Sequence, residues 1–231
     1  MTVPYETAKA DLLQAVLMHV PFDGWSEAAF QAAIRDTDLA PSVARAICPR
    51  GAVDLAIAFH KAGDAAMLER LSEADMSGMK FREKVTAAVR YRLEVVEDKE
   101  AVRRGTTLFA LPMYAPDGAK LVWGTCDAIW TALGDTSEDV NWYTKRATLA
   151  GVYSSTVLYW LGDDSPDYMA TWAFLDRRIE DVMRIEDVKA RVRKSPTLSR
   201  LMAGPNWVLG QIKAPSRSPR TDMPGRWTTP R

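Results

Sequence analysis

The sequence predicts an all-α fold, and three observations support this prediction. Apolar residues recur at intervals of three and four along nearly the whole chain, which is the period of an amphipathic helix. Ser, Thr, Asp, Gly and Pro stand at the breaks between these segments, where helices begin and end. No segment alternates polar and apolar residues beside a hairpin turn, so we expect no β-sheet. With 231 residues, of which 47% are hydrophobic, the chain can bury the core of a globular protein.

The first third of the chain contains four predicted helices. Ser26 is placed to cap the second helix, and Pro41 suits the first turn of a short third helix. The apolar face of the first helix carries leucine and valine at helical spacing. The predicted helices cover Tyr5–Val20, Glu27–Arg35, a short piece from Pro41 to Cys48, and Gly51–Ser72.

Five longer helices are predicted in the rest of the chain. The first is rich in charge pairs four residues apart, and Pro112 stops the second. Thr136 can cap the fourth, with Ser137 as the near alternative, because Asp139 lies three residues after Thr136 and can reach back to the cap amide. The predicted helices cover Met79–Glu97, Glu100–Leu111, Ala119–Leu133, Thr136 to Gly162, and Ser165–Met183.

The helix after Thr136 has two distinct faces. One face carries small residues, which let a neighbouring helix approach closely, and we expect this face to be buried. Its members are Val140, Thr144, Ala147, Gly151 and Ser155. The other face carries two aromatic residues between an acid and a base, at spacings of three, four and seven. Its members are Asp139, Trp142, Tyr143 and Arg146.

Charge is spread unevenly, although the formal net charge is zero. Residues 1–75 hold 6 basic and 11 acidic residues, net −5. Residues 76–183 hold 13 basic and 16 acidic residues, net −3, and residues 184–231 hold 11 basic and 3 acidic residues, net +8. We therefore predict three regions with boundaries after residues 75 and 183.

The order of the helices resembles that of tetracycline-repressor-type regulators, in which a helix-turn-helix head precedes a helical ligand-binding body. Residues 24–59, GWSEAAFQAAIRDTDLAPSVARAICPRGAVDLAIAF, match the head. Phosphate repels an acidic head, and the predicted recognition helix, PSVARAIC, offers only Arg45, with Arg50 just beyond it. We therefore interpret the head as degenerate and expect no nucleic acid partner.

Two long motifs carry a second resemblance. The stretch GDTSEDVNWYTKRATLAGVYSSTVLYWLGD, followed by TWAFLDRRIEDV, closely resembles the ubiquinone (coenzyme Q) biosynthesis accessory family. GWSEAAF and RLSEADMSGMKFREKVTAAVRYRLE fit its earlier parts, so the resemblance covers roughly Tyr5 to Ile212. It implies a tetracycline-repressor-like, isoprenoid-lipid-binding protein that assists the di-iron hydroxylase of the pathway at the membrane.

The resemblance assigns roles to two sets of residues. The face formed by Asp139, Trp142, Tyr143 and Arg146 matches a surface that engages the hydroxylase, and the alternative is that Trp142 is core. The helices of the body would enclose an isoprenoid or phospholipid, and the alternative is that their apolar stripes are plain core. The candidate lipid-binding residues are Trp123, Ile129, Trp130, Val152, Leu158, Trp172 and Phe174.

The basic segment SPTLSRLMAGPNWVLGQIKA combines apolar area with positive charge, which suits a helix lying on an anionic membrane. Gly204 and Pro205 should kink it, and the alternative is a terminal helix packed on the core or on a second copy. The candidate membrane-surface residues are Arg200, Leu201, Met202, Trp207, Val208, Leu209, Ile212 and Lys213.

Motifs for intrinsic catalysis are absent from the sequence. His19 and His60 form no metal-binding HxxH or ExxH pairing, and no phosphate-binding glycine loop or GxSxG elbow occurs. Paired carboxylates at Asp163–Asp164 and Asp135 to Asp139 suit helix caps and turns better than acid–base chemistry. We expect no enzyme activity, no cofactor and no metal.

These observations favour a non-catalytic lipid-presenting accessory protein of ubiquinone biosynthesis. The two cysteines and the lack of an apolar run of about 18 residues suit a reduced cytoplasmic protein, peripheral at the inner face of the membrane. A ligand-responsive transcription regulator is the main alternative. A helical dimerisation protein without ligand is the other, and a homodimer is possible under each interpretation.

Overall fold

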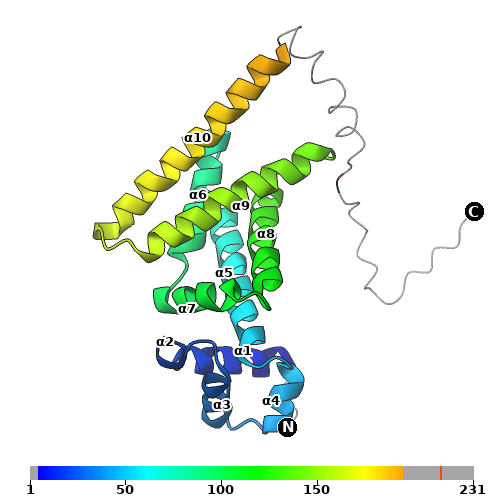
Figure 1. Ribbon diagram of the computed structural model, residues 1–231, viewed down its shortest axis with the longest axis vertical. Coiled ribbons are helices and arrows are strands. Elements are labelled where there is room, and N and C mark those ends of the chain that lie inside the picture. The colour runs from blue at the N-terminus through cyan, green and yellow to red at the C-terminus, as the bar shows by residue number, and fades with distance from the viewer. Residues whose placement is uncertain (1–4, 195–213, 215–231) are drawn as a thin grey trace, which may run out of the picture.

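The computed structural model describes residues 5–194 and residue 214, and this part of the chain contains no β-strand, so the all-α prediction is confirmed. Figure 1 shows α1–α4 at one end, α5 running from them into a larger group of helices, and α9 and α10 across that group. The elements are α1 (Tyr5–Leu17), α2 (Val20–Asp23), α3 (Glu27–Asp36), α4 (Pro41–Ile47), α5 (Ala52–Glu73), α6 (Phe81–Glu94), α7 (Lys99–Ala110), α8 (Ala115–Ala132), α9 (Val140–Leu161), a 3-10 turn η1 (Pro166–Tyr168) and α10 (Met169–Lys194).

Two hydrophobic cores meet within α5. The first joins α1, α3, α4 and the N-terminal half of α5, down to Ala56, with Ala101 of α7. The second begins at Met67 and joins the C-terminal half of α5 to α6, α8, α9 and α10. We call the helices around the first core the head and those around the second core the body. The predicted boundary after residue 75 follows the end of α5, whereas the cores divide in its middle.

Proline positions explain two differences in helix boundaries. The predicted first helix is interrupted, because α1 ends at Leu17 and Pro21 lies in the first turn of the separate helix α2. Helix α8 begins at Ala115, earlier than predicted, because Pro116 lies in its first turn, where no backbone N–H is needed.

Helix α9 begins later than predicted and turns a different face inward. Asp139 is its N-cap, and the Asp139 carboxylate accepts the backbone N–H of Asn141 at 2.9 Å, so the prediction of Thr136 as cap is wrong. Thr144, Ala147 and Gly151 are exposed, so the prediction that the small-residue face is buried is also wrong. The buried face instead carries larger side chains that pack on α8 and α10, namely Arg146, Leu149, Val152, Tyr153, Thr156 and Trp160.

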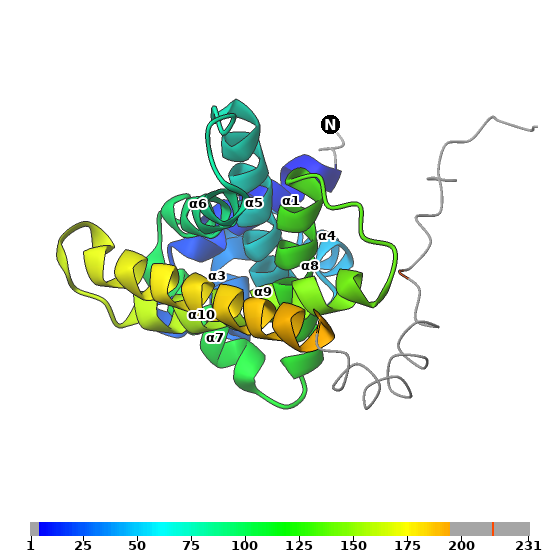
Figure 2. The same ribbon diagram turned by 90° about the horizontal axis from the view of Figure 1, so that it is seen from above.

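Helix α10 is longer than predicted. It follows two residues with positive φ, Asp167 and Tyr168, and continues to Lys194, past the predicted end at Met183. No Gly or Pro occurs within it, so nothing in the sequence stops the helix at Met183. The predicted boundary after residue 183 therefore lies inside α10. Seen from above, α10 crosses over α9 (Figure 2), and it also contacts α6.

Candidate functional site: a pocket with a polar floor

The body contains a pocket of about 330 Å³, lined by residues of α5 to α9 and by Trp25 of the head. Most lining side chains are apolar, including Phe59, Leu93, Val102, Phe109, Val122 and Val157. Leu158 is 61% exposed and lines the same pocket, as do the exposed Ala110 and Ala119, so the opening lies beside α9 and the α7–α8 connection. Such a cavity suits an apolar ligand or the end of a longer one.

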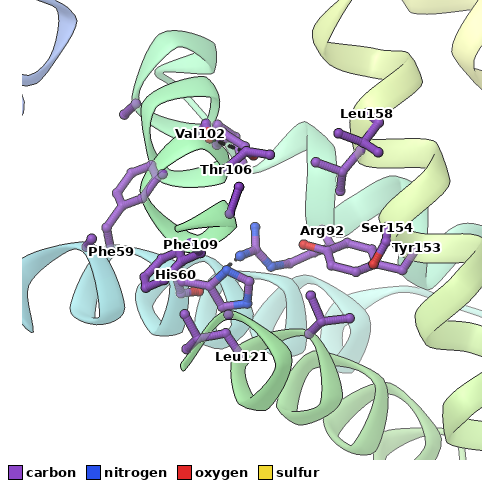
Figure 3. Close-up of a pocket in the computed structure, with 18 of the residues that line it drawn as sticks. Phe59, His60, Arg92, Val102, Thr106, Phe109, Leu121, Tyr153, Ser154 and Leu158 are labelled. Atoms are coloured by element: carbon purple, nitrogen blue, oxygen red, sulfur yellow. Dashed lines mark hydrogen bonds between the residues drawn. The ribbon is translucent and has the colours of Figure 1, made fainter. Parts of the chain in front are cut away.

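Polar side chains interrupt the apolar lining, among them His60, Arg92 and Tyr153 (Figure 3). Arg92 is only 4% exposed, and its Nε donates to Oδ1 of Asp64 at 2.7 Å. Nη2 of Arg92 donates to the backbone oxygen of His60 at 3.0 Å. The Thr125 hydroxyl lies 2.9 Å from Oδ1 of Asp64 and 2.9 Å from Nε2 of His60. We call these four residues, His60, Asp64, Arg92 and Thr125, the polar floor. His60 and Arg92 line the pocket, and Asp64 and Thr125 are their partners outside the lining.

The polar floor carries one cation and one anion at neutral pH. Burial, and then the neighbouring Arg92 cation, lowers the pKa of His60 to about 4, so His60 is neutral. Burial disfavours the charged form of Arg92, but the negative charges of Tyr153, once its phenol ionises at high pH, and of Asp64 outweigh burial and raise the pKa of Arg92. Burial also raises the pKa of the Tyr153 phenol, which is neutral as well. The charges of Arg92 and Asp64 therefore cancel beside an apolar cavity.

The structure places one of the seven candidate lipid-binding residues in this pocket, Leu158. Ile129 and Val152 are buried in the core of the body, where they pack against other side chains. Neither residue lines this pocket. Helical spacing identifies a buried position without showing whether the space beside it is filled.

The four candidate aromatic residues lie outside this pocket. The Trp130 ring stacks on Phe81 at 5.4 Å, and Phe174 stacks on Tyr159 at 4.5 Å. Trp172 donates its indole N–H to the backbone oxygen of Asp167 at 2.8 Å. Trp123 joins Trp142 and Tyr143, as described below. Each ring therefore packs against another part of the molecule.

Sequence reasoning missed the polar residues of the pocket, which are His60, Arg92, Thr106, Tyr153 and Ser154. One signal was available for Arg92, which occupies the same face of its amphipathic helix as Val85, Ala88 and Val89. An arginine at a core position is costly to bury without partners, so it marks an internal polar site. For His60 the only local signal was Asp64, four residues later on the same helix, since its hydrogen-bond partner Thr125 comes from α8.

Three aromatic rings gather where α8 meets the start of α9. The ring centroids of Trp123 and Trp142 lie 5.8 Å apart, and those of Trp142 and Tyr143 lie 4.8 Å apart in an edge-on arrangement. All three residues are partly exposed, so Trp142 is neither a fully buried core residue nor a free surface residue. We call Trp123, Trp142 and Tyr143 the aromatic surface. Asp139, at the N-cap of α9, is exposed nearby.

Arg146 does not lie on that surface, and the prediction that it does is wrong. Its side chain is completely buried, and it donates to Asp127 at 2.6 Å and to Asp135 at 3.0 Å. Its guanidinium carbon lies 4.0 Å from the ring centroid of Trp142, from the buried side. Two carboxylates distant in sequence draw the guanidinium inward, and helical spacing on α9 cannot reveal them. Arg146 therefore supports the aromatic surface from beneath.

The candidate membrane-surface residues, Arg200 to Lys213, lie outside the described residues. Within the described part, no helix is both long and apolar enough to cross a membrane. No cluster of three or more His, Cys, Asp or Glu side chains in that part could hold a metal ion.

Two arginines of the head, Arg45 and Arg50, are paired with acids. Arg45 of α4 forms an ion pair with Glu27 of α3. Arg50 binds Asp54 at 2.9 Å and Asp117 of α8 at 2.8 Å. These pairs offset the positive charge of the two arginines in and just after α4, the helix that would meet a phosphate backbone.

Comparisons with known proteins confirm the resemblance to the ubiquinone-biosynthesis family. Residues 115–186 match the COQ9 protein family. The chain is 31% identical over 193 residues to ubiquinone biosynthesis protein COQ9-A, mitochondrial, of Xenopus laevis, covering 79% of this chain and 60% of the relative. The Drosophila melanogaster COQ9 protein is 32% identical, with 78% and 57% covered, and the human protein is 28% identical, with 80% and 60% covered. The chain thus spans about 60% of the length of these curated relatives.

A solved structure confirms the predicted fold. The crystal structure of the TetR transcriptional regulator from Nitrosomonas europaea superposes with a TM-score of 0.62 at 15% identity, covering 75% of this chain and 97% of that chain. The likeness establishes a tetracycline-repressor-like fold, because the topology agrees over most of both chains.

Proposed function

We propose that this chain, which is similar in sequence to COQ9 ubiquinone-biosynthesis proteins, is a non-catalytic accessory protein of that pathway. In this proposal the pocket of the body holds part of an isoprenoid lipid and presents it to the hydroxylase that modifies it. The observation that carries the proposal is the apolar pocket itself, which opens beside the exposed Leu158. The chain's sequence relatives are named as ubiquinone biosynthesis proteins.

The pocket is suited to lipid by its lining and its opening. Burying apolar ligand surface is worth about 25 cal/mol per Å², so contacts with residues such as Phe59, Phe109 and Val122 supply affinity without directional bonds. At about 330 Å³ the pocket is at the small end of ligand sites. A long isoprenoid chain therefore leaves through the opening, where Leu158 offers it an apolar contact.

The aromatic surface is the proposed docking site for the hydroxylase. Trp and Tyr are the residues that most often dominate the energy of an interface. Arg146, with Asp127 and Asp135 beneath it, fixes the position of the Trp142 ring, so the surface is already ordered before a partner binds. Asp139 at the rim adds a charged contact.

The basic C-terminal region is the proposed membrane contact. Residues 184–231 carry a net charge of +8, and each basic residue near an anionic surface contributes about 1 kcal/mol. An accessory protein at the membrane would meet isoprenoid lipids where they are dissolved. Liposome co-sedimentation of the full chain and of a chain ending at Lys194 tests this part of the proposal, and equal binding by both would contradict it.

Transcriptional regulation is less well supported than lipid presentation. The fold permits a helix-turn-helix head, but Arg45 and Arg50 are engaged by acidic partners and the first 75 residues carry a net charge of −5. Retention on heparin at low salt, matched by DNA binding, would favour the regulator over the accessory protein.

Native mass spectrometry of the purified full chain tests the lipid proposal. We expect a co-purified isoprenoid or other lipid. In Ala119→Trp, a large ring at the rim of the pocket should reduce lipid occupancy, whereas the neighbouring Lys120→Trp, outside the lining, should not. Lipid-free spectra of the folded wild-type protein, or equal occupancy in both variants, would contradict the proposal.

A further inference from the structure

We propose that the polar floor binds the oxygen-bearing ring of an electrically neutral amphipathic lipid, which enters the pocket head first, and that Arg92 is the specificity-determining residue. This inference rests on the proposed lipid-binding function and adds the orientation and chemistry of the ligand. It predicts that a quinone or phenol ring lies against Arg92 while the isoprenoid tail leaves past Leu158.

The Arg92 guanidinium has one nitrogen that donates no hydrogen bond within the described part of the protein. Its Nε and Nη2 donate to Asp64 and to the backbone oxygen of His60, and within the described residues Nη1 has no acceptor. Arg92 lines the pocket, so an acceptor in the cavity can approach its guanidinium. A buried guanidinium with an unused donor favours a ligand that carries an oxygen acceptor over a pure hydrocarbon.

The backbone of α5 is shaped to receive the guanidinium. A Cβ atom at Gly63 would lie 2.6 Å from Nη1 and 2.8 Å from Cζ of Arg92, so any larger residue at this position would displace the group. Gly63 precedes Asp64, the ion-pair partner. One glycine and one carboxylate therefore fix the plane of the guanidinium, which is the arrangement required for a directional contact with a ligand.

The charge balance of the floor favours a neutral ligand. Asp64 already neutralises Arg92, His60 is uncharged at neutral pH, and no second cation lines the pocket among the described residues. A phosphate or carboxylate brought into this cavity would lose its hydration without gaining a net countercharge. A carbonyl or hydroxyl oxygen has a much smaller desolvation cost, so it can use the donor of Arg92.

The orientation follows from the positions of the polar and apolar ends. Figure 3 shows His60 and Leu121 on one side of the cavity and Leu158 on the opposite side, with Arg92 directed between them. The oxygen acceptor has to reach Arg92, and the apolar tail needs the exit beside Leu158, which is 61% exposed. A ligand with a polar ring and an apolar tail satisfies both conditions in one orientation only.

The experiment compares three probes of similar chain length by calorimetric titration of the full chain. Decylubiquinone carries ring oxygens, decylbenzene lacks them, and dodecyl phosphate carries an anionic head. The wild type should bind decylubiquinone about tenfold more tightly than decylbenzene, and it should bind dodecyl phosphate more weakly than decylubiquinone.

Two variants perturb the guanidinium site of Arg92 while keeping a positive charge there. A third variant, at a different arginine, serves as the control. Arg92→Lys keeps the cation but removes the planar donor, and Gly63→Ala displaces the guanidinium without changing any polar group. Both should reduce the preference for decylubiquinone to within about threefold while leaving decylbenzene binding unchanged. Arg90→Lys, on the same helix but paired with Glu94 at the surface, should keep the full preference.

The outcomes separate this inference from the function on which it rests. If the wild type binds none of the probes, the lipid-binding proposal itself is contradicted. If decylubiquinone and decylbenzene bind equally, or if both Arg92→Lys and Gly63→Ala keep the wild-type ratio, only the role of Arg92 is overturned. Tighter binding of dodecyl phosphate than of decylubiquinone would overturn the neutrality of the ligand. Decylbenzene binding by each variant confirms that its pocket is folded.

Discussion

Arg92 in α6 and Arg146 in α9 are both buried arginines paired with aspartate, yet their surroundings give them different roles. Arg92 is 4% exposed and Arg146 is 0% exposed. Arg92 pairs with Asp64 at 2.7 Å, and Arg146 pairs with Asp127 at 2.6 Å and with Asp135 at 3.0 Å. The difference lies on the side of the guanidinium away from the aspartate, where Arg92 borders a cavity and Arg146 borders the Trp142 ring. Burial and ion pairing alone therefore do not identify a ligand site.

The largest effect we predict is on stability, from Arg146→Met. This change leaves Asp135, with 2% of its side chain exposed, without one of its two cationic partners, and it removes support from beneath Trp142. Loss of one member of a buried ion pair costs about 3–5 kcal/mol. Urea unfolding measures the change in the free energy of unfolding.

The matching variant Arg92→Met allows the loss of stability at the two buried arginines to be compared. Its partner Asp64 keeps the Thr125 hydroxyl as a donor and retains 17% side-chain exposure, so the loss should be smaller than for Arg146→Met. An equal or larger loss would mean that the pocket side of Arg92 is as tightly packed as the Trp142 side of Arg146.

The second prediction is that the two clusters lose stability in different pH ranges. The unfolded chain protonates His60 near pH 6.5, whereas the folded chain does so only at about pH 4. The unfolded state therefore binds more protons between these values, and stability should fall by up to about 3 kcal/mol as pH drops from 6.5 to 4. His60→Gln should remove this slope in urea titrations at several pH values.

Asp135 should affect the stability of the protein only below the pH range in which His60 titrates. Burial opposes its ionisation, but hydrogen bonds from Lys145, Ser137 and Arg146 outweigh burial and hold its pKa below the usual 3.8. The stability it contributes is present above pH 3.8 and is lost as the pH falls further. A His60→Gln variant that still loses stability between pH 6.5 and 4.5 would show that another group titrates there.

The third prediction concerns Trp142→Ala, which tests the aromatic surface. We expect hydroxylase binding to weaken by about 2 kcal/mol, or roughly thirtyfold, because partly exposed tryptophans dominate interface energies. Loss of the contacts with Trp123 and Arg146 should cost about 1–2 kcal/mol of stability. A pull-down and a thermal melt of the same variant measure both quantities. Unchanged binding together with a loss of more than about 3 kcal/mol would identify Trp142 as core.

Apolar periodicity and helix breaks were enough to predict most helices, because both depend on residues close together in the sequence. The partners of a buried polar side chain are not local. Arg146 shares a helical face with Asp139, but Asp127 and Asp135, on and after α8, turn it inward. Arg92 was overlooked for the same reason, since Asp64 lies 28 residues away. A cavity is harder still to predict, because it depends on which side chains fail to fill the space between five helices.

The smallest predicted effect comes from a part of α9 that touches neither arginine. Gly151 is exposed in mid-helix, and a Cβ added there would meet nothing within 4 Å. Gly151→Ala should therefore stabilise the protein by about 0.5–1 kcal/mol, because alanine loses less backbone entropy than glycine in a helix. The preference for decylubiquinone and the binding of the hydroxylase should not change. If Gly151→Ala destabilises the protein in urea unfolding, a neighbouring helix covers this face, and the small residues of α9 have the packing role that their spacing first suggested.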